Sequence, residues 1–399
     1  MTPERFRALW SSLLPIGLDR RTGGYFRYGW SDADLACREW FAEEAADRGM
    51  DVAADGNGNL IAWWGSGGPA VLTGSHFDSV PNGGAYDGPL GIVSAFLAVD
   101  LLRERGAAPA GRIGIAAFAE EEGARFGVAC LGSRLMTGAL APERALALRD
   151  GDGVSLGDAL TKAGADPARL GPSLPAVDAY VELHVEQGRL LSTGEHTAPV
   201  GVASAIWPHG RWRLDLTGEG NHAGTTRMAD RCDPMLTLSY AILAANKEAR
   251  LRGAHATVGR VEVTPNATNA IPPSVSAWLD ARAAQAETLD GLVEAVAAKV
   301  TERAGRDGTS VAVTAESVSP AVEFDGGLRD RVAALLRAPI LPTGAGHDAG
   351  VLSAHVPTAM LFVRNPTGVS HAPAERATDA DCAAGVTALA DVLQDLACR

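Results

Sequence analysis

Several features that would place the chain in a special class are missing from its 399 residues. No stretch approaches the run of about eighteen apolar residues that a membrane-spanning helix needs. The N-terminal segment MTPERFRALWSSLLPIG mixes acidic with basic residues and has no clean apolar core, so it predicts an amphipathic helix rather than a signal peptide. Internal repeats and low-complexity linkers are absent as well. We therefore expect a globular, cytoplasmic protein.

Cysteine and runs of positive charge are also scarce. The five cysteines are odd in number, scattered, and form no CxxC pair, which predicts free thiols in a reducing compartment rather than a disulfide or zinc-finger framework. The formal net charge is −13, without any run of Lys or Arg. This charge argues against nucleic acid or an anionic membrane as a partner.

Apolar strands alternate with helical segments over most of the chain. Strands are predicted at 70–73, 113–118 and 179–185, and residues 88–105 have helical periodicity. After about residue 320 the same pattern returns, with a helix, a strand and a final helix at 328–336, 358–363 and 379–397. Strands that alternate with helices predict an α/β sheet covered by helices on both faces.

Residues 209–318 have a different character. The segment RWRLDLTGEG alternates with period two, and the elements that follow give the order β-α-β-β-α-β. This order predicts a small α+β domain inserted in the larger one. The expected layout is a discontinuous main domain, 1–208 and 319–399, interrupted by an inserted domain, 209–318.

Side chains that bind metals stand at or just after the apolar strands of the main domain. They are His76, the run Glu120–Glu122, His184, His371, and Asp87 in the glycine-rich loop NGGAYDGPLG. In open α/β sheets, sites form outside the carboxyl ends of the strands, so these side chains can converge.

Each position has a simpler explanation. A lone histidine in a loop is usually a surface residue, Asp87 can be the N-cap of the following helix, and a run of three glutamates is usually solvated. The run follows a wholly apolar strand, however, and an acidic cluster there needs a nearby cation or shifted pKa values. Taken together, the positions indicate a site.

Seven motifs carry a resemblance to a known family. GSHFDSVPNGGAYDGPLG, EEEGARF, ELHVEQG, GEGNHAGTTRM, PNATNAIP, GAGHDA and SHAPAE occur in this order. They resemble the hydantoinase/carbamoylase branch of the M20 metallopeptidase-like amidohydrolases, which contains N-carbamoyl-L-amino-acid hydrolases, β-ureidopropionases and allantoate amidohydrolases. ELHVEQG is specific to the branch, because peptidase relatives generally carry a carboxylate where His184 stands. The resemblance implies a zinc-peptidase-like mixed sheet and an inserted lid that also forms a homodimer.

The resemblance further implies two divalent metal ions per chain, zinc first, with manganese, cobalt or nickel as alternatives. Asp87 would bridge the two ions, His76 and His184 would complete one site, and Glu122 and His371 the other. Imidazole and carboxylate ligands suit zinc and manganese. A water shared by two such ions loses its proton near neutral pH and becomes a nucleophile.

The carboxylates around these ligands have separate expected roles. Glu121 would be the general base that takes the proton of the water and later gives it to the leaving nitrogen. Asp78, two residues after His76, would orient that imidazole. The family usually has a non-acidic residue before EEG, so Glu120 is a departure, and we expect its side chain to be solvated.

The inserted domain carries residues that match substrate-holding positions of the family. His222 and Asn269 would polarise the scissile carbonyl, and Arg282 would clamp a substrate carboxylate through two hydrogen bonds. Gln187 and His347 are weaker candidates for substrate contact. The simpler explanations are a strand-end cap for His222, a turn at Asn269 and a surface salt bridge for Arg282.

Two departures bear on the substrate. Arg227 stands where the family commonly has proline, and IWPHGRW is an unusual entry to the inserted domain. The sequence predicts hydrolysis of an N-carbamoyl group or related linear amide on a small carboxylate-bearing molecule, with an allantoate-type amidohydrolase or a specialised amidase as the alternative. A non-catalytic binding protein would have lost ligands or base, and a dehydrogenase would have GxGxxG after a strand. Neither is observed.

Overall fold

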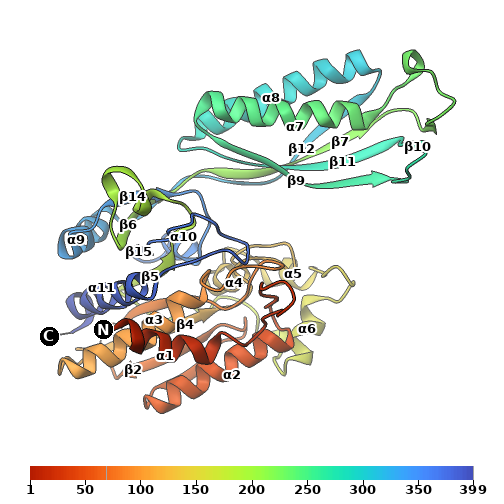
Figure 1. The fold of residues 1–399 in the computed structure, drawn as a ribbon. Coiled ribbons are helices and arrows are strands. Elements are labelled where there is room, and N and C mark those ends of the chain that lie inside the picture. The colour runs from red at the N-terminus through yellow and green to blue at the C-terminus, as the bar shows by residue number, and fades with distance from the viewer. Residues whose placement is uncertain (69, 399) are drawn as a thin grey trace. The chain divides into compact units, whose positions relative to one another are not determined.

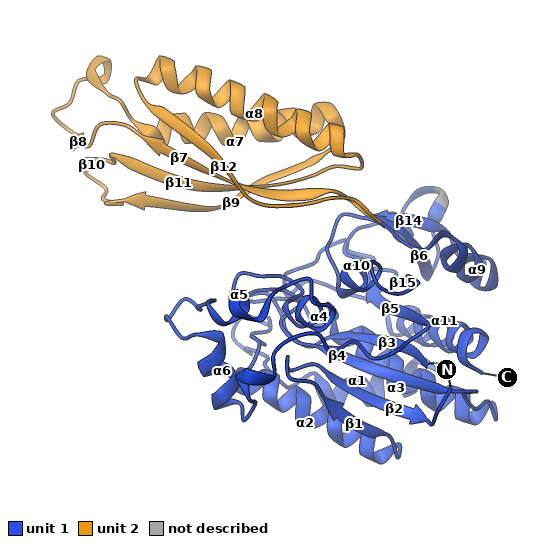
Figure 2. Ribbon diagram, turned by 180° about the vertical axis from the view of Figure 1, so that it is seen from behind, with its two compact units in different colours: residues 1–205, 323–399 blue, residues 206–322 orange. Residues whose placement is uncertain are grey.

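The chain folds into two compact units in a computed structural model, which describes residues 1–68 and 70–398. Unit 1 comprises residues 1–205 and 323–399, and unit 2 comprises residues 206–322 (Figure 2). The predicted boundaries, 209 and 318, both lie inside unit 2. Within the described ranges no helix is both long and apolar enough to span a bilayer, and all five cysteines are free thiols.

Unit 1 is built on a nine-stranded sheet of order β1-β2-β4-β3-β5-β15-β6-β13, with β14 beside β6 (Figure 1). The central strands β4, β3, β5 and β15 are parallel to one another, whereas β2 runs antiparallel to β4 and β6 antiparallel to β15. The sheet is therefore mixed, as predicted. The strands are β1 (Asp51–Ala54), β2 (Leu60–Gly65), β3 (Ala70–His76), β4 (Arg112–Phe118), β5 (Ala179–Val185), β6 (Val200–Ile206), β13 (Val322–Glu323), β14 (Ile340–Thr343) and β15 (Thr358–Val363).

Two long helices anchor the core of unit 1. α3 (Pro89–Glu104) is buried along almost its whole length and packs against α11 (Asp379–Ala397) and against β3 and β5. Both helices lie where the apolar periodicity predicts them. The remaining helices are α1 (Pro3–Leu13), α2 (Asp32–Asp47), α4 (Leu131–Thr137), α5 (Pro142–Leu146), α6 (Leu156–Lys162), α9 (Gly326–Leu336) and α10 (Asp348–Leu352), with short 3-10 turns at Pro167–Arg169, Leu190–Ser192 and Gly194–His196.

Unit 2 is an antiparallel four-stranded sheet, in the order β12-β7-β11-β9, with two helices. Every second residue of β11 is buried, so one face of the sheet packs against the helices and the other carries polar side chains. The predicted fold of a mixed sheet with a smaller α+β domain is confirmed. The elements are β7 (His209–Thr217), β8 (Asn221–His222), a 3-10 turn (Met228–Asp230), α7 (Pro234–Arg252), β9 (His255–Thr264), β10 (Ala270–Ile271), β11 (Ser274–Arg282), α8 (Ala286–Asp307) and β12 (Ser310–Ser319).

Candidate active site

Asp87 lies at the centre of a cluster of histidines and carboxylates in unit 1. Its Oδ1 is 3.6 Å from Nε2 of His76 and 3.2 Å from Nε2 of His184. Its Oδ2 faces the other way and is 3.3 Å from Nε2 of His371. The simpler role of helix cap is not filled, because Gly88 is the N-cap of α3 and no side chain of the described residues caps that helix. One carboxylate therefore joins two groups of ligand-type atoms.

The first group consists of His76, Asp87 and His184, whose ligand-type atoms lie within 4.8 Å of one another. His76 ends β3 and His184 lies in β5, and both side chains are fully buried. Their Nδ1 atoms lie 3.0 and 2.9 Å from the carbonyl oxygens of Asp78 and Val185, which can only accept hydrogen bonds. Each Nδ1 therefore carries a proton, and each Nε2 faces the Asp87 carboxylate.

The local backbone brings these rings together. Gly88 has φ +83°, and a Cβ there would lie 2.4 Å from Cε1 of His76. The Gly88 N–H also donates to Nε2 of His184 at 3.2 Å. A side chain at this position would displace the His76 ring, so the close approach requires glycine.

The second group consists of Asp87, Glu122 and His371, again within 4.8 Å. Oε2 of Glu122 is 3.5 Å from Nε2 of His371, which is half exposed. Burial and the neighbouring Asp87 raise the pKa of Glu122 to about 7. Burial also raises the pKa of Asp87, but hydrogen bonds from His184, His371 and His76 outweigh this and hold it well below its usual value.

The donor set of both groups fits divalent metal ions. Nε2 of His76 and Oε1 of Glu122 are buried and have no hydrogen-bond partner among the described residues. Such atoms are costly in a folded protein unless something else binds them. Imidazole nitrogen and carboxylate oxygen together are ligands for zinc and related ions. A cation at each group would also favour ionised carboxylates where burial disfavours them.

Glu121 lies beside the first group and faces away from the second. Its Oε2 is 3.8 Å from Nε2 of His76, and its Oε1 accepts a hydrogen bond from Sγ of Cys130 at 3.4 Å. Burial, with the nearby carboxylates of Asp348 and Glu122, raises the pKa of Glu121 well above its usual value, although His76 opposes the shift. The adjacent residues Glu121 and Glu122 therefore lie beside different ligand groups.

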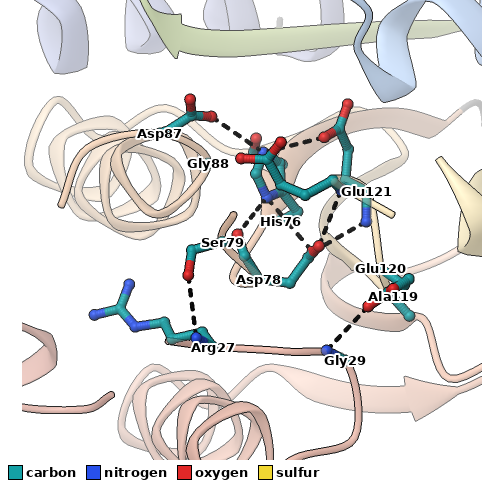
Figure 3. A network of polar contacts seen from close by, with 12 residues as sticks. Arg27, Gly29, His76, Asp78, Ser79, Asp87, Gly88, Ala119, Glu120 and Glu121 are labelled. Atoms are coloured by element: carbon teal, nitrogen blue, oxygen red, sulfur yellow. Dashed lines mark hydrogen bonds and ion pairs between the residues drawn. The ribbon is translucent and has the colours of Figure 1, made fainter. Parts of the chain in front are cut away.

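Asp78 contacts the His76 ring that it was predicted to orient. Its backbone carbonyl, rather than its carboxylate, makes the hydrogen bond to His76, and Oδ1 stays 3.5 Å from that ring. The carboxylate instead accepts the N–H groups of Glu121 at 3.0 Å and Glu122 at 2.9 Å (Figure 3). Asp78 therefore links the β3 loop to the turn that carries both glutamates.

The expectation that Glu120 is solvated is wrong. Its side chain is only 1% exposed, and its carboxylate accepts the N–H groups of Gly29, Arg125 and Phe126. Burial and the nearby Asp78 raise the pKa of Glu120 to about 7. The three backbone donors satisfy the carboxylate inside the protein, which water would otherwise do.

Two residues near Asp87 were missed by the sequence analysis. Oε1 of Glu375 accepts the N–H groups of Tyr86 and Asp87, both at 2.9 Å. Oγ of Ser370 donates to Oε2 of Glu375 at 2.7 Å and to Oδ2 of Asp87 at 3.1 Å. Both residues belong to the motif SHAPAE, in which only His371 was predicted to be a site residue. They fix the loop that carries the shared carboxylate.

Gln187 and His347 also lie in this cluster. Nε2 of Gln187 donates to Oδ2 of Asp87 at 2.8 Å and lies 3.3 Å from Nε2 of His371. His347 is buried, its ring centroid is 4.5 Å from that of His184, and its Nε2 lacks a partner among the described residues. Burial, with the nearby positive charge of His184, holds the pKa of His347 well below its usual value.

His222 and Asn269 lie in unit 2, His222 on the short strand β8 and Asn269 just before its partner strand β10. His222 pairs with Ala270, and the carbonyl of Asn269 accepts the N–H of Ala223. Nδ1 of His222 accepts the N–H groups of Gly224 at 3.0 Å and Thr225 at 3.2 Å. A neutral His222 ring therefore carries its proton on Nε2. The side chains of both residues are exposed.

Arg282 ends β11 on the polar face of the unit 2 sheet. Its Nε and one terminal nitrogen donate to the two carboxylate oxygens of Asp280 at 2.9 and 3.1 Å. Arg227, the departure from the family, makes a similar two-point pair with Asp230 on the surface. In the unusual segment 206–212, the Trp207 ring lies 5.5 Å from that of His255.

Comparison with known proteins agrees with this architecture. A family model described as peptidase family M20/M25/M40 matches residues 72–395. The N-carbamoyl-L-amino acid amidohydrolase of Geobacillus stearothermophilus is 37% identical, over 98% of each chain. The allantoate amidohydrolase of Escherichia coli K12 is 33% identical, over 94% of this chain and 93% of that protein. The crystal structure of an amidase of the hydantoinase/carbamoylase family from Burkholderia vietnamiensis superposes with a TM-score of 0.90 at 29% identity, covering 100% and 98% of the two chains.

The mixed sheet with its separate four-stranded domain is a zinc-peptidase-like fold. Within that class, the chain belongs to the M20 family, in its hydantoinase/carbamoylase branch. It is an amidohydrolase, an enzyme that cleaves linear C–N bonds.

Proposed function

We propose that this amidohydrolase removes an N-carbamoyl (ureido) group, or cleaves a related linear amide, on a small carboxylate-bearing molecule. The observation that carries the proposal is the pair of ligand groups that share Asp87. The similarity to an N-carbamoyl-L-amino acid amidohydrolase over 98% of the chain supports the substrate class.

Two divalent ions would be held by these groups, with zinc the first choice and manganese, cobalt or nickel as alternatives. His76 and His184 would bind one ion, Glu122 and His371 the other, and Asp87 both. When bound, such ions supply an acidified water and polarise the scissile carbonyl. The Nδ1 hydrogen bond of His76 supports this assignment, because its Nε2 faces Asp87 and has no hydrogen-bond partner among the described residues.

Glu121 would move the protons. Its carboxylate lies beside the first group but is not part of either group of ligand-type atoms. A buried carboxylate with a raised pKa holds a proton more strongly than an exposed one, which suits a group that accepts a proton and then donates it to the leaving nitrogen. Cys130 would keep one of its oxygens oriented.

His222, Asn269 and Arg282 would bind the substrate from the inserted unit. The backbone hydrogen bonds to Nδ1 leave the Nε2–H of His222 as a donor for a carbonyl oxygen that gains charge. The fork of Arg282 is already oriented by Asp280, and a substrate carboxylate could accept from the same planar group. Gln187 and His347 would complete the substrate contacts beside the ligand groups.

A homodimer through unit 2 is part of this proposal. β9 is an outer strand of its sheet, so one edge has no neighbouring strand among the described residues. The outer face of α7 exposes apolar side chains, with Leu243 69% and Leu236 49% exposed. A second copy would cover both features, which an isolated chain leaves as a site for association.

An allantoate-type reaction is the second candidate. The 33% identity to an allantoate amidohydrolase over 94% of the chain supports it. Both candidates use the same residues and differ in the substrate.

A substrate panel tests the proposal. The metal-loaded protein is assayed with N-carbamoyl amino acids, allantoate and neutral amides, before and after prolonged chelation and after addition of zinc, manganese, cobalt or nickel. We expect turnover of at least one ureido acid, its loss on chelation, and its return with metal. Full activity in protein shown to be metal-free would refute the two-metal site, and turnover of allantoate alone would select the second candidate.

A further inference from the structure

Glu120 is a buried carboxylate next to the proposed base, and its partners are all backbone groups. Its Oε1 accepts the N–H groups of Arg125 at 2.7 Å and Phe126 at 2.9 Å. Its Oε2 accepts that of Gly29 at 3.0 Å (Figure 3). These donors come from the loop after Glu122 and from the segment before α2. Glu120 therefore ties two distant segments to the end of β4.

The backbone at Glu120 needs such support. Its φ is +53°, in the left-handed region that residues other than glycine seldom adopt. A residue of this kind persists where surrounding contacts fix it. Asp78 holds the next two N–H groups, and the Leu131 N–H donates to the carbonyl of Glu120 at 3.1 Å. The turn is thus held on each side.

The orientation of this turn decides where two neighbouring side chains point. Oε2 of Glu121 faces His76 in the first group, whereas Oε2 of Glu122 faces His371 in the second. A small rotation of the backbone would move both carboxylates from their groups. Contacts that fix this turn therefore also fix the positions of the proposed base, Glu121, and of the proposed metal ligand, Glu122.

We propose that Glu120 is a positioning residue that fixes the left-handed turn from which Glu121 and Glu122 project. The inference rests on the proposed function, since it assumes that Glu121 is the base. Glu120 touches neither of the two ligand groups and acts through the backbone of its neighbours.

Gly29 is the partner of Glu120 in one of these hydrogen bonds, and there is no room for a side chain at this position. A Cβ added at Gly29 would lie 2.4 Å from Oε2 of Glu120 and 3.2 Å from its Cβ. The guanidinium of Arg125 donates to the Gly29 carbonyl at 2.6 Å and pairs with Asp150 at 3.0 Å, so this segment is held close. A larger residue at position 29 would push the Glu120 side chain away.

The first experiment replaces Glu120 with Gln. The amide has one oxygen and one NH2 group, so at least one of the three N–H donors would face another donor. We expect kcat to fall by about 10- to 100-fold, because misplacing a catalytic group by about 1 Å can cost about 10². The KM should stay close to that of the wild type, and the affinity for the metal held by Glu122 should fall, because this ligand projects from the same turn. Hydrogen exchange at the amides of Gly29, Arg125 and Phe126 should become faster.

Glu43→Gln, on the exposed side of α2, is the matched control for loss of one negative charge, and its kcat should be unchanged. A folded, metal-loaded Glu120→Gln protein with kcat within about twofold of the wild type would overturn the inference. That failure is distinct from failure of the proposed function, in which Glu121→Gln would also remain active.

A double-mutant cycle gives a second test, which does not depend on the folding of Glu120→Gln. Gly29→Ala alone should lower kcat in the same way, because its methyl group displaces the Glu120 carboxylate. In a Glu120→Ala background, the same change should add little, since the displaced group is gone. Additive losses would show that the two residues act independently and would overturn the proposal.

Discussion

The two units hold their functional side chains in different ways. In unit 1, His76, His184 and Asp87 are buried, and the backbone of Asp87 and Gly88 is held by Glu375 and His184, which lie far away in the sequence. In unit 2, His222 and Asn269 are exposed, His222 on a strand of two residues and Asn269 just before another, and the Nδ1 of His222 is held by the N–H groups of Gly224 and Thr225. Unit 1 therefore holds a buried cluster of ligand-type side chains, whereas the proposed substrate-binding residues of unit 2 lie exposed at two short paired strands.

This difference has an energetic basis. Buried carboxylates and imidazoles are stable only when their hydrogen-bonding groups are satisfied, so the cluster in unit 1 must be built by the whole fold. Exposed residues have no such requirement and can be placed by a local turn. Mutations in unit 1 should therefore affect metal content and chemistry, whereas mutations in unit 2 should affect transition-state and substrate binding.

The largest effect is expected inside unit 1. Glu121→Gln should lower kcat by about 10²- to 10⁴-fold, because a general base is removed while both ligand groups remain intact. Glu122→Gln is the matched change on the adjacent residue, and it should lower metal content as well. Metal analysis of the two purified proteins checks the distinction. Metal loss from the Glu121 variant instead would mean that the roles of the two residues are exchanged.

An effect of the next size is expected from unit 2. His222→Ala should lower kcat by about 10²- to 10³-fold, as the loss of one donor to a developing oxyanion does. If His222 serves the partner's site in a homodimer, mixing inactive His222→Ala chains with inactive Glu121→Ala chains should restore activity. With random pairing, about half of the dimers are mixed and each has one native site, so roughly a quarter of wild-type activity should return.

Subunit exchange has to be verified independently in that experiment, for example with two differently tagged chains. If exchange is complete and no activity returns, His222 acts within its own chain or not at all. In that case, the activity of each chain would not depend on a residue of the partner chain.

The smallest effect is expected at Arg282. Arg282→Lys keeps the charge but loses the planar fork, so KM for carboxylate-bearing substrates should rise by about tenfold. Neutral amide analogues should change much less. Arg211→Lys, on the neighbouring strand and 3.7 Å from the same Asp280, is the control and should behave as the wild type. Equal losses for acids and neutral amides would make Arg282 a structural residue.

Periodicity and strand ends predicted the larger elements well. The strand at 358–363 and the helix at 379–397 have the observed bounds, because long apolar patterns are strong local signals. His76 and His184 could be placed at one edge of the sheet, since parallel strands end on the same side. By contrast, β8 and β10 have two residues each and leave no periodic pattern to detect.

The supporting carboxylates were beyond sequence reasoning for a physical reason. A run of glutamates is normally solvated, and only the fold brings the Gly29 N–H to Glu120. Likewise, Glu375 accepts the N–H of Asp87 although the two are separated by most of the chain. Nothing local distinguishes these residues from ordinary surface acids, because their partners are backbone groups, which every residue possesses.

The insertion of unit 2 has a consequence for how the chain folds. Within unit 2, β7 pairs with β12, and His209 lies opposite Ser319, so the first and last strands of the insertion are neighbours. In unit 1, the flanking strands β6 and β13 are neighbours too. Once unit 2 has folded, its two ends are already adjacent, and closing the edge of the large sheet no longer requires ordering a long flexible loop. We therefore expect the insertion to fold as an autonomous module and to nucleate the pairing of β6 with β13.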